Sequence, residues 1–311
     1  MKGYALVGTA AVLSGLISIF GKLMIQYPGN SPVALMSVRA SIAFAALAAG
    51  LLLLRRQELR LAWRDVPFFA LFGLVGVAGC FSLYLIALQH TSVTTAIVIV
   101  YTCPVQVAIL AALFLGERLN ARKLLALGAA IVGCLLVAQA YDLNSLRGNF
   151  TGILFSFGVS VSLTAYNLLA KRAVGRYSAW TMTVYAFGFG SLWMMLIAAP
   201  PAILAIRLPA EGWLILFAWA LIPTVFGNVL YLSALKYIEV SATTIVSTLE
   251  LVSAIGLACL LLGESIQGLQ LVGALFVVAA VVILSRGART VGTKSPLSPE
   301  QSEVQVVQMV S

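Results

Sequence analysis

The fold of this chain follows from one stretch that occurs twice. The first copy begins with Tyr84-Leu85-Ile86-Ala87-Leu88 and ends with Leu115-Gly116-Glu117. The second copy begins with Tyr231-Leu232-Ser233-Ala234-Leu235 and ends with Leu262-Gly263-Glu264, and both ends are shifted by 147 residues (231 − 84 and 264 − 117). Apolar matches alone carry little weight in an apolar chain, but two markers that keep their spacing indicate an internal duplication.

The composition places the duplicated unit in a membrane. Of the 311 residues, 61% are hydrophobic and 9% are charged. A soluble domain has about 25% charged residues, so most of this chain is expected to face lipid. The formal net charge is +9. The basic residues are not gathered on a polar domain, which excludes a nucleic-acid partner and leaves the lipid bilayer as the expected one.

Ten apolar runs are long enough to cross a membrane, which takes about 20 residues of helix. Because lipid offers the backbone no hydrogen-bond partners, the crossings must be helices. The first run is longer than the apolar core of a signal peptide, and we expect it to be retained. The fold class is therefore all-α, with ten transmembrane helices at residues 4–25, 33–54, 66–88, 93–115, 121–140, 151–171, 180–200, 212–235, 241–262 and 268–285.

The basic residues predict the orientation. With the N-terminus inside, Lys22, Arg147 and Arg207 fall outside, Arg39 lies within the second run, and the other 15 of the 19 basic residues fall inside. This bias predicts that both termini are cytoplasmic. Each half holds five helices, an odd number, so the second half would enter the membrane from the opposite side, as in many secondary transporters. We expect a first five-helix repeat at 1–145, a second, inverted repeat at 146–286, and a disordered cytoplasmic tail at 287–311.

The sequence shows no sign of an enzyme. It contains no phosphate-binding glycine loop, aspartate-rich diphosphate motif or zinc-binding helix. The four cysteines lie inside apolar runs without metal-ligand spacing, and the single histidine, His90, lies in a short loop. We therefore predict no catalytic residue, no metal site and no cofactor.

Glu250 is the strongest candidate for a functional residue. It lies near the middle of the ninth run, where an ionised side chain costs at least about 2.5–3.5 kcal/mol. It is either a substrate or proton site, or a protonated carboxyl held for structure. The equivalent position in the first copy is Cys103, and the following Pro104 predicts a bend in that helix. Because Leu251 follows Glu250, we expect the bend in one copy and the charge in the other.

Other polar and aromatic residues at membrane depth could line a central cavity. An alternative interpretation stays open for each group. The aromatic residues could instead form belts at the membrane interfaces, and the amides could instead hydrogen-bond between helices. The candidates are Tyr84, Tyr101, Tyr166, Trp219 and Tyr231, with Gln106, Asn167 and Asn228. Arg39 could anchor a substrate carboxylate or brace the helices.

Two pairs of charges could act as latches. Lys22 and Lys171 end the first helix of each half, at opposite faces of the membrane. By the inverted symmetry, Lys171 shares the inner face with Glu117, and Lys22 shares the outer face with Glu264. The alternative is that the lysines snorkel to the interface and never meet the glutamates.

The ten helices, the inverted repeat and the Leu-Gly-Glu endings of the fourth and ninth helices together resemble the drug/metabolite transporter superfamily, in its EamA-type branch. Arg39, Lys22, Lys171, Pro104 and Glu250 fit that pattern, and the likeness covers residues 3–285. Leu251 departs from it, because a proline usually follows the second-half glutamate. Within the branch, the chain looks most like bacterial amino-acid exporters of the YddG type.

The resemblance implies a secondary transporter of a bacterial inner membrane that exports amino acids, including aromatic ones, and related metabolites by alternating access. It also implies a central cavity between helices 1, 3, 4, 6, 8 and 9, and it permits proton coupling. Three alternatives remain: a multidrug or cationic-metabolite exporter, a phosphate-ester exchanger, and a non-transporting membrane scaffold. The oligomeric state is left open.

Overall fold

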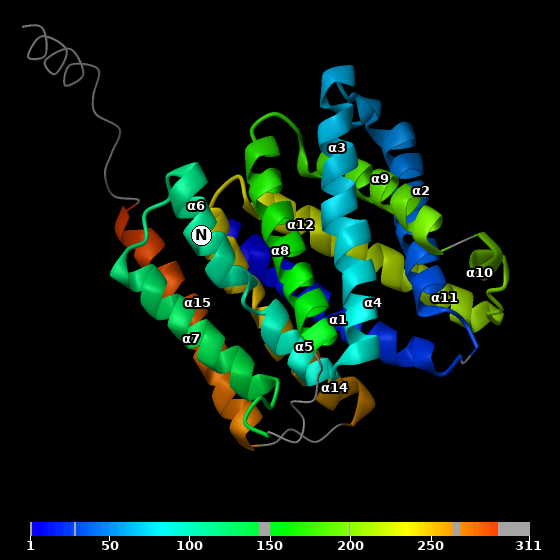
Figure 1. Cartoon of the computed structure of the whole chain (residues 1–311). Helices are drawn as coiled ribbons and strands as arrows, with labels where there is room; N and C mark the ends of the chain where they lie inside the picture. The colour runs from blue at the N-terminus through cyan, green and yellow to red at the C-terminus, as the bar shows by residue number, and fades with distance from the viewer. Residues whose placement is uncertain (1, 28, 143–149, 199, 264–267, 292–311) are drawn as a thin grey trace, which may run out of the picture.

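The structure is a computed structural model that describes residues 2–27, 29–142, 150–198, 200–263 and 268–291 (Figure 1). All elements in these ranges are helices. Some consecutive helical segments continue one another and form a single span. Counted in this way, the described residues contain nine spans that are long and apolar enough to cross a membrane: Lys2–Met24, Pro32–Leu54, Trp63–His90, Val93–Leu115, Phe150–Ala173, Ala179–Ile197, Ala210–Ala234, Val240–Leu262 and Gly268–Arg286. The chain is thus an all-helical, multi-pass membrane protein.

The nine spans coincide with nine of the ten predicted crossings. The remaining prediction, at 121–140, falls on α7 (Ala121–Val137), a helix of 17 residues. At about 1.5 Å per residue it is about 25 Å long, which is shorter than the other spans. Helix α15 (Gly268–Val291) continues past the predicted start of the tail, so residues 287–291 are helical, while 292–311 lie outside the described residues.

The third span of each half contains a wide helical turn. In the first half, α3 (Val66–Gly73) and α4 (Cys80–His90) are joined by the π-helix η3 (Leu74–Gly79). In the second half, α11 (Ala210–Trp219) and α12 (Gly227–Ala234) are joined by the π-helix η4 (Ala220–Phe226). Such turns often lie at functional sites, because they change which side chains face inward.

The fourth and ninth spans are interrupted at the same place in both copies. Helix α5 (Val93–Val100) stops before α6 (Cys103–Leu115), which carries Pro104 in its first turn. Helix α13 (Val240–Ser247) likewise stops before α14 (Leu249–Leu262), although no proline is present. The helical pattern is thus interrupted in both copies, whereas a bend was expected in the first copy alone.

A threonine explains why the second break needs no proline. The hydroxyl of Thr248 donates to the carbonyl oxygen of Ile245 at 2.7 Å, and the hydroxyl of Thr102 donates to that of Ile99 at the same distance. Side-chain hydroxyls that bond back to the helix compete with its regular hydrogen bonds and bend it. The amide of Leu251 then bonds to the Thr248 carbonyl, three residues back, at 3.1 Å.

The Leu-Gly-Glu motif ends a helix in the same way in both copies. Gly116 follows α6 with φ 68° and ψ 20°, and Gly263 follows α14 with φ 68° and ψ 22°. These are left-handed conformations, which glycine adopts without steric cost at the C-terminus of a helix. The Leu-Gly part of the motif is thus a helix-stop signal in both copies.

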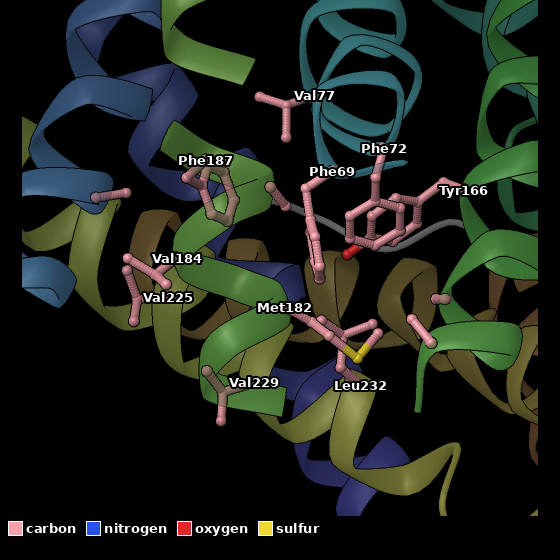
Figure 2. Close-up of a cluster of buried hydrophobic side chains, with 14 of the residues drawn as sticks. Phe69, Phe72, Val77, Tyr166, Met182, Val184, Phe187, Val225, Val229 and Leu232 are labelled. Carbon is pink, nitrogen blue, oxygen red and sulfur yellow. The ribbon is translucent and has the colours of Figure 1, made fainter. Parts of the chain in front are cut away.

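Two features hold the helices together. At one side, α7 and α15 run side by side (Figure 1) with their backbones in contact: a Cβ on Gly133 would lie 2.8 Å from the Gly273 oxygen, and one on Gly273 would lie 2.7 Å from the Gly133 oxygen. At the centre, an apolar cluster joins α3, α8 (Phe150–Ala173), α9 (Ala179–Ala198) and α12 (Figure 2). In it the Phe72 ring stacks on the Tyr166 ring at 4.5 Å.

Candidate functional site

A cavity of about 390 Å3 lies among the spans, which is the size of a pocket for a small solute. Its wall comes from α1 (Lys2–Ile25), α2 (Pro32–Leu54), α8, α9, and the interrupted third, fourth, eighth and ninth predicted crossings. The breaks and wide turns described above lie in these crossings. They direct side chains toward the wall that a regular helix would point elsewhere.

Eight of the residues predicted for the site lie in this wall, and three do not. The wall contains Arg39, Tyr101, Pro104, Tyr166, Asn167, Asn228, Tyr231 and Glu250. Gln106 instead joins α6 to α8, because its amide nitrogen donates to the Ser160 hydroxyl at 3.0 Å and its oxygen accepts from Thr164 at 3.1 Å. Trp219 is 3% exposed and packs against Arg39, and Tyr84 lies on α4 outside the wall.

The amides and tyrosines of the wall bond to one another. Tyr166 and Asn228 form a reciprocal pair: the hydroxyl donates to the amide oxygen at 3.1 Å, and the amide nitrogen donates to the hydroxyl at 3.0 Å. Thr183 also donates to the Asn228 oxygen at 3.2 Å, and the Tyr231 hydroxyl donates to the Asn167 oxygen. These bonds connect α8, α9 and α12, so this side of the cavity is a rigid polar surface.

Glu250 is placed by the break in the ninth span. The interruption at Thr248 puts Glu250 in the first turn of α14, where the helix dipole favours a carboxylate. The side chain is half-buried and reaches the cavity. No hydrogen bond or ion pair joins it to another described residue, which leaves its oxygens available to a solute.

Arg39 faces the same cavity from α2. Its guanidinium carbon lies 4.6 Å from the centre of the Phe81 ring and 4.5 Å from that of the Trp219 ring. The two rings attract the positive charge of the guanidinium and so offset part of the cost of burying it. The Nε and Nη1 atoms have no acceptor in the part of the chain that the structure describes.

Sequence reasoning missed several hydroxyl residues of the wall. Ser14, Thr244, Ser247 and Thr248 all line the cavity. A detectable signal existed, because Ser247 and Thr248 follow Thr244 by three and four residues and therefore lie near the same helix face as Thr244. It was weak because such hydroxyls often bond within their own helix, as Thr244 does to the Val240 oxygen at 3.2 Å.

Glu117 and Lys171 do not contact each other directly. They hold opposite ends of residues 235–241, which connect α12 to the first turn of α13. Glu117 accepts from the backbone amides of Val240 at 2.7 Å and Ser241 at 3.3 Å and from the Ser241 hydroxyl, so it caps α13. The Lys171 ammonium donates to the carbonyl oxygens of Leu235 at 2.6 Å and Ile238 at 2.8 Å.

A second basic residue, Lys123, binds the Glu117 carboxylate. Lys123 pairs with Glu117 at 3.4 Å and also with Glu239. Of the other predicted latch, Lys22 lies in the last turn of α1, while Glu264 lies outside the described residues.

The connection between α8 and α9 is anchored separately. Arg176 pairs with Asp65 at 3.1 Å, and the Tyr177 hydroxyl donates to the same carboxylate. This hydrogen bond to Asp65 raises the pKa of Tyr177, because it stabilises the protonated hydroxyl. It ties the segment after α8 to the 3₁₀ turn η2 (Trp63–Asp65) that precedes α3.

A multi-pass helical protein whose interrupted spans surround a cavity with charged and polar residues in its wall has the architecture of a membrane transporter. Residues 1–139 and 150–286 each match the EamA-like transporter family, and the chain belongs to this family.

Relatives extend over nearly the whole chain. An "Uncharacterized transporter" of Archaeoglobus fulgidus is 27% identical over 284 residues, which cover 91% of this chain and 96% of that protein. A "Probable terminal-alkyne amino-acid exporter" of Streptantibioticus cattleyicolor is 27% identical over 285 residues, which cover 90% of this chain and 92% of that protein. A solved crystal structure with 17% identity superposes with a TM-score of 0.79 over 94% of this chain and 99% of that one, which shows the same fold.

Proposed function

We propose that this protein is a secondary transporter that exports amino acids, including aromatic ones, and related metabolites by alternating access through the central cavity. The observation that carries the proposal is Glu250: a carboxyl group in the wall of a membrane-embedded cavity, without a described partner, in a member of a transporter family. The ammonium group of a solute would supply the partner of this carboxyl group. The aromatic wall and the named activity of one relative support amino acids as the substrate class.

The test is efflux of labelled amino acids from proteoliposomes. We expect Glu250→Gln to lower efflux at least tenfold, because the lost charge–ammonium contact contributes about 1.5–3 kcal/mol. Glu211→Gln is the matched control, because Glu211 is exposed in the first turn of α11. Equal efflux in both variants would remove Glu250 from the site, and absence of amino-acid efflux in the unaltered protein would refute the function.

We further propose ten crossings in a five-plus-five inverted repeat, with α7 as the fifth crossing and both termini cytoplasmic in a bacterial inner membrane. Three observations support it: two separate family matches, the interruptions repeated in both halves, and the pairing of α7 with α15, the last helix of each half. The repeats would be residues 1–145 and 146–286.

Single cysteines in a cysteine-free background test the topology. Gln26→Cys, after α1, should react with a membrane-impermeant maleimide in intact cells. Gly175→Cys, after α8, should react only in permeabilised cells. Both positions are exposed, and a Cβ on Gly175 has no neighbour within 4 Å. Labelling of both from the same side would contradict the inverted arrangement.

Alternating access needs contacts that close one side at a time. We propose that Glu117 and Lys171 close the inner side by holding residues 235–241, and that Lys22 and Glu264 do the same at the outer side. Glu250 could couple transport to a proton. A pH gradient across the proteoliposomes tests this, because coupled efflux would follow the gradient and uncoupled efflux would not.

A cation exporter of the same fold is the second candidate, since an aromatic wall with one carboxylate also suits organic cations. The presence of Arg39 in the same wall disfavours it, because its charge repels them. Competition between amino acids and organic cations for efflux separates the two functions.

A further inference from the structure

We propose that Arg39 is a carboxylate-binding subsite of the cavity, and that the transported solutes are therefore acids that carry an ammonium group, not simple amines. The inference rests on the proposed transport function and specifies its substrate class. It assigns to Arg39 the recognition of one end of the solute.

The first argument is that the charge of Arg39 has no counter-ion. The residue is 1% exposed, and no described carboxylate lies within ion-pair distance. The other buried charged residues of the described chain, Glu117 and Lys123, pair with each other. A buried charge without a partner is strongly destabilising, so its occurrence at a cavity wall indicates that a ligand supplies the partner.

The second argument is the kind of hydrogen-bonding group that is unsatisfied. The Nε and Nη1 atoms of Arg39 and the indole Nε1 of Trp219 are buried donors without an acceptor among the described residues. The two side chains are in contact, since the guanidinium carbon lies 4.5 Å from the centre of the indole ring. The rings of Phe81 and Trp219 attract the positive charge, but they do not accept in-plane N–H bonds. A group of donors with no acceptor fits an ionised carboxylate, which only accepts.

The third argument is the position of the opposite charge. Glu250 lies in the wall of the same cavity as Arg39, and Cys80 lines that cavity too. A solute with a carboxylate and an ammonium group complements both ends. A solute with only the ammonium group would meet the uncompensated charge of Arg39.

The two roles open to Arg39 predict different consequences of removing it. If Arg39 only braced α2 against its aromatic neighbours, Arg39→Met would weaken the fold and slow every solute by the same factor. If it binds carboxylates, Arg39→Met removes an unpaired buried charge, so the fold keeps or gains stability, and only the preference for acids is lost.

The experiment compares three labelled probes in proteoliposomes that contain the full chain: phenylalanine, its amide, and its decarboxylated amine. We expect the unaltered protein to prefer phenylalanine to the amide at least tenfold in kcat/KM. Arg39→Met should reduce this ratio to about one with efflux of the amide retained. Arg207→Met is the control, because Arg207 is exposed, and it should leave the ratio unchanged.

Two further variants keep the test decisive if Arg39→Met does not fold. Arg39→Lys keeps the charge but loses the planar set of donors, and Arg39→Gln keeps a planar donor group but loses the charge. Each should lower the acid-to-amide ratio severalfold. Deaminated phenylalanine separates the two ends of the site, because its efflux should depend on Arg39 but not on Glu250.

The possible failures are distinguishable. If the unaltered protein moves phenylalanine and amide equally well, or if Arg39→Met slows all probes by one factor, the carboxylate subsite is refuted while the transport function stands. A clear preference for the decarboxylated amine also refutes the subsite and favours a cation exporter. If the unaltered protein moves none of the probes, the proposed function itself fails.

Discussion

Removing the Glu117 carboxylate should open the cavity from the side of the membrane where that residue lies. In the structure this carboxylate, from the first half of the chain, caps α13 in the second half through two backbone amides and a hydroxyl. Val240 and Ser241 are both fully buried, so water cannot replace the lost acceptor. Glu117→Ala therefore leaves unsatisfied donors in the first turn of α13.

The magnitude follows from these contacts. A hydrogen bond to a charged group contributes about 1.5–3 kcal/mol, and removing one partner of a buried ion pair costs about 3–5 kcal/mol. Lys123 keeps its contact with Glu239, so we use the lower value, about 3 kcal/mol. Since every 1.4 kcal/mol is a factor of ten, the closed arrangement should lose roughly 100-fold in its equilibrium constant. Glu117→Gln keeps one acceptor oxygen and should have a smaller effect.

The native cysteines of the wall provide the assay. Cys80 and Cys103 both line the cavity, so their rate of reaction with a membrane-impermeant maleimide reports access to it. In vesicles of either orientation, Glu117→Ala should accelerate labelling only from the Glu117 side. Glu211→Ala is the control. If labelling is unchanged while the thermal stability falls, Glu117 supports the fold but does not close the cavity, and the reasoning is refuted.

Three further predictions follow from local geometry. Exchanging Lys171 and Glu117 for each other should not restore transport, because each would then face backbone groups of the wrong polarity; recovery in the double variant would show a direct ion pair. Gly76→Ala should lower the thermal unfolding temperature, at a cost of about 1–3 kcal/mol, because its Cβ would lie 2.1 Å from a tyrosine ring, whereas Gly128→Ala, with no neighbour within 4 Å, should not. Thr248→Val should slow efflux at least severalfold by removing the hydroxyl bond that interrupts the ninth span, and unchanged efflux would mean that the break does not depend on it.

Much of the fold was predictable because lipid imposes simple rules. Nine of the predicted runs coincide with spans, since a helix that crosses a membrane must be apolar along its whole length. The Leu-Gly-Glu motif was informative because only glycine adopts the left-handed end at positions 116 and 263 without strain. The interruption before Glu250 was not predicted, since it depends on one hydroxyl and not on a proline.

The site was harder to predict because depth in the membrane does not give the direction of a side chain. Trp219 was expected in the cavity wall, but its ring lies against Arg39. Gln106 was expected there too, but its amide joins two helices. Both outcomes depend on residues far away in the chain: Trp219 follows Arg39 by 180 residues (219 − 39). Only the packed structure brings such residues together.

The contact between α7 and α15 limits how the molecule can rearrange. Gly133 and Gly273 bring the two backbones into contact, and the side chains of Val277 and Leu136 pack against these glycines, so the two helices interlock at this point. This close contact favours movement of α7 and α15 as one rigid pair in any rearrangement of the other helices. A methyl group added at either glycine would meet the backbone of the opposite helix and push the two helices apart.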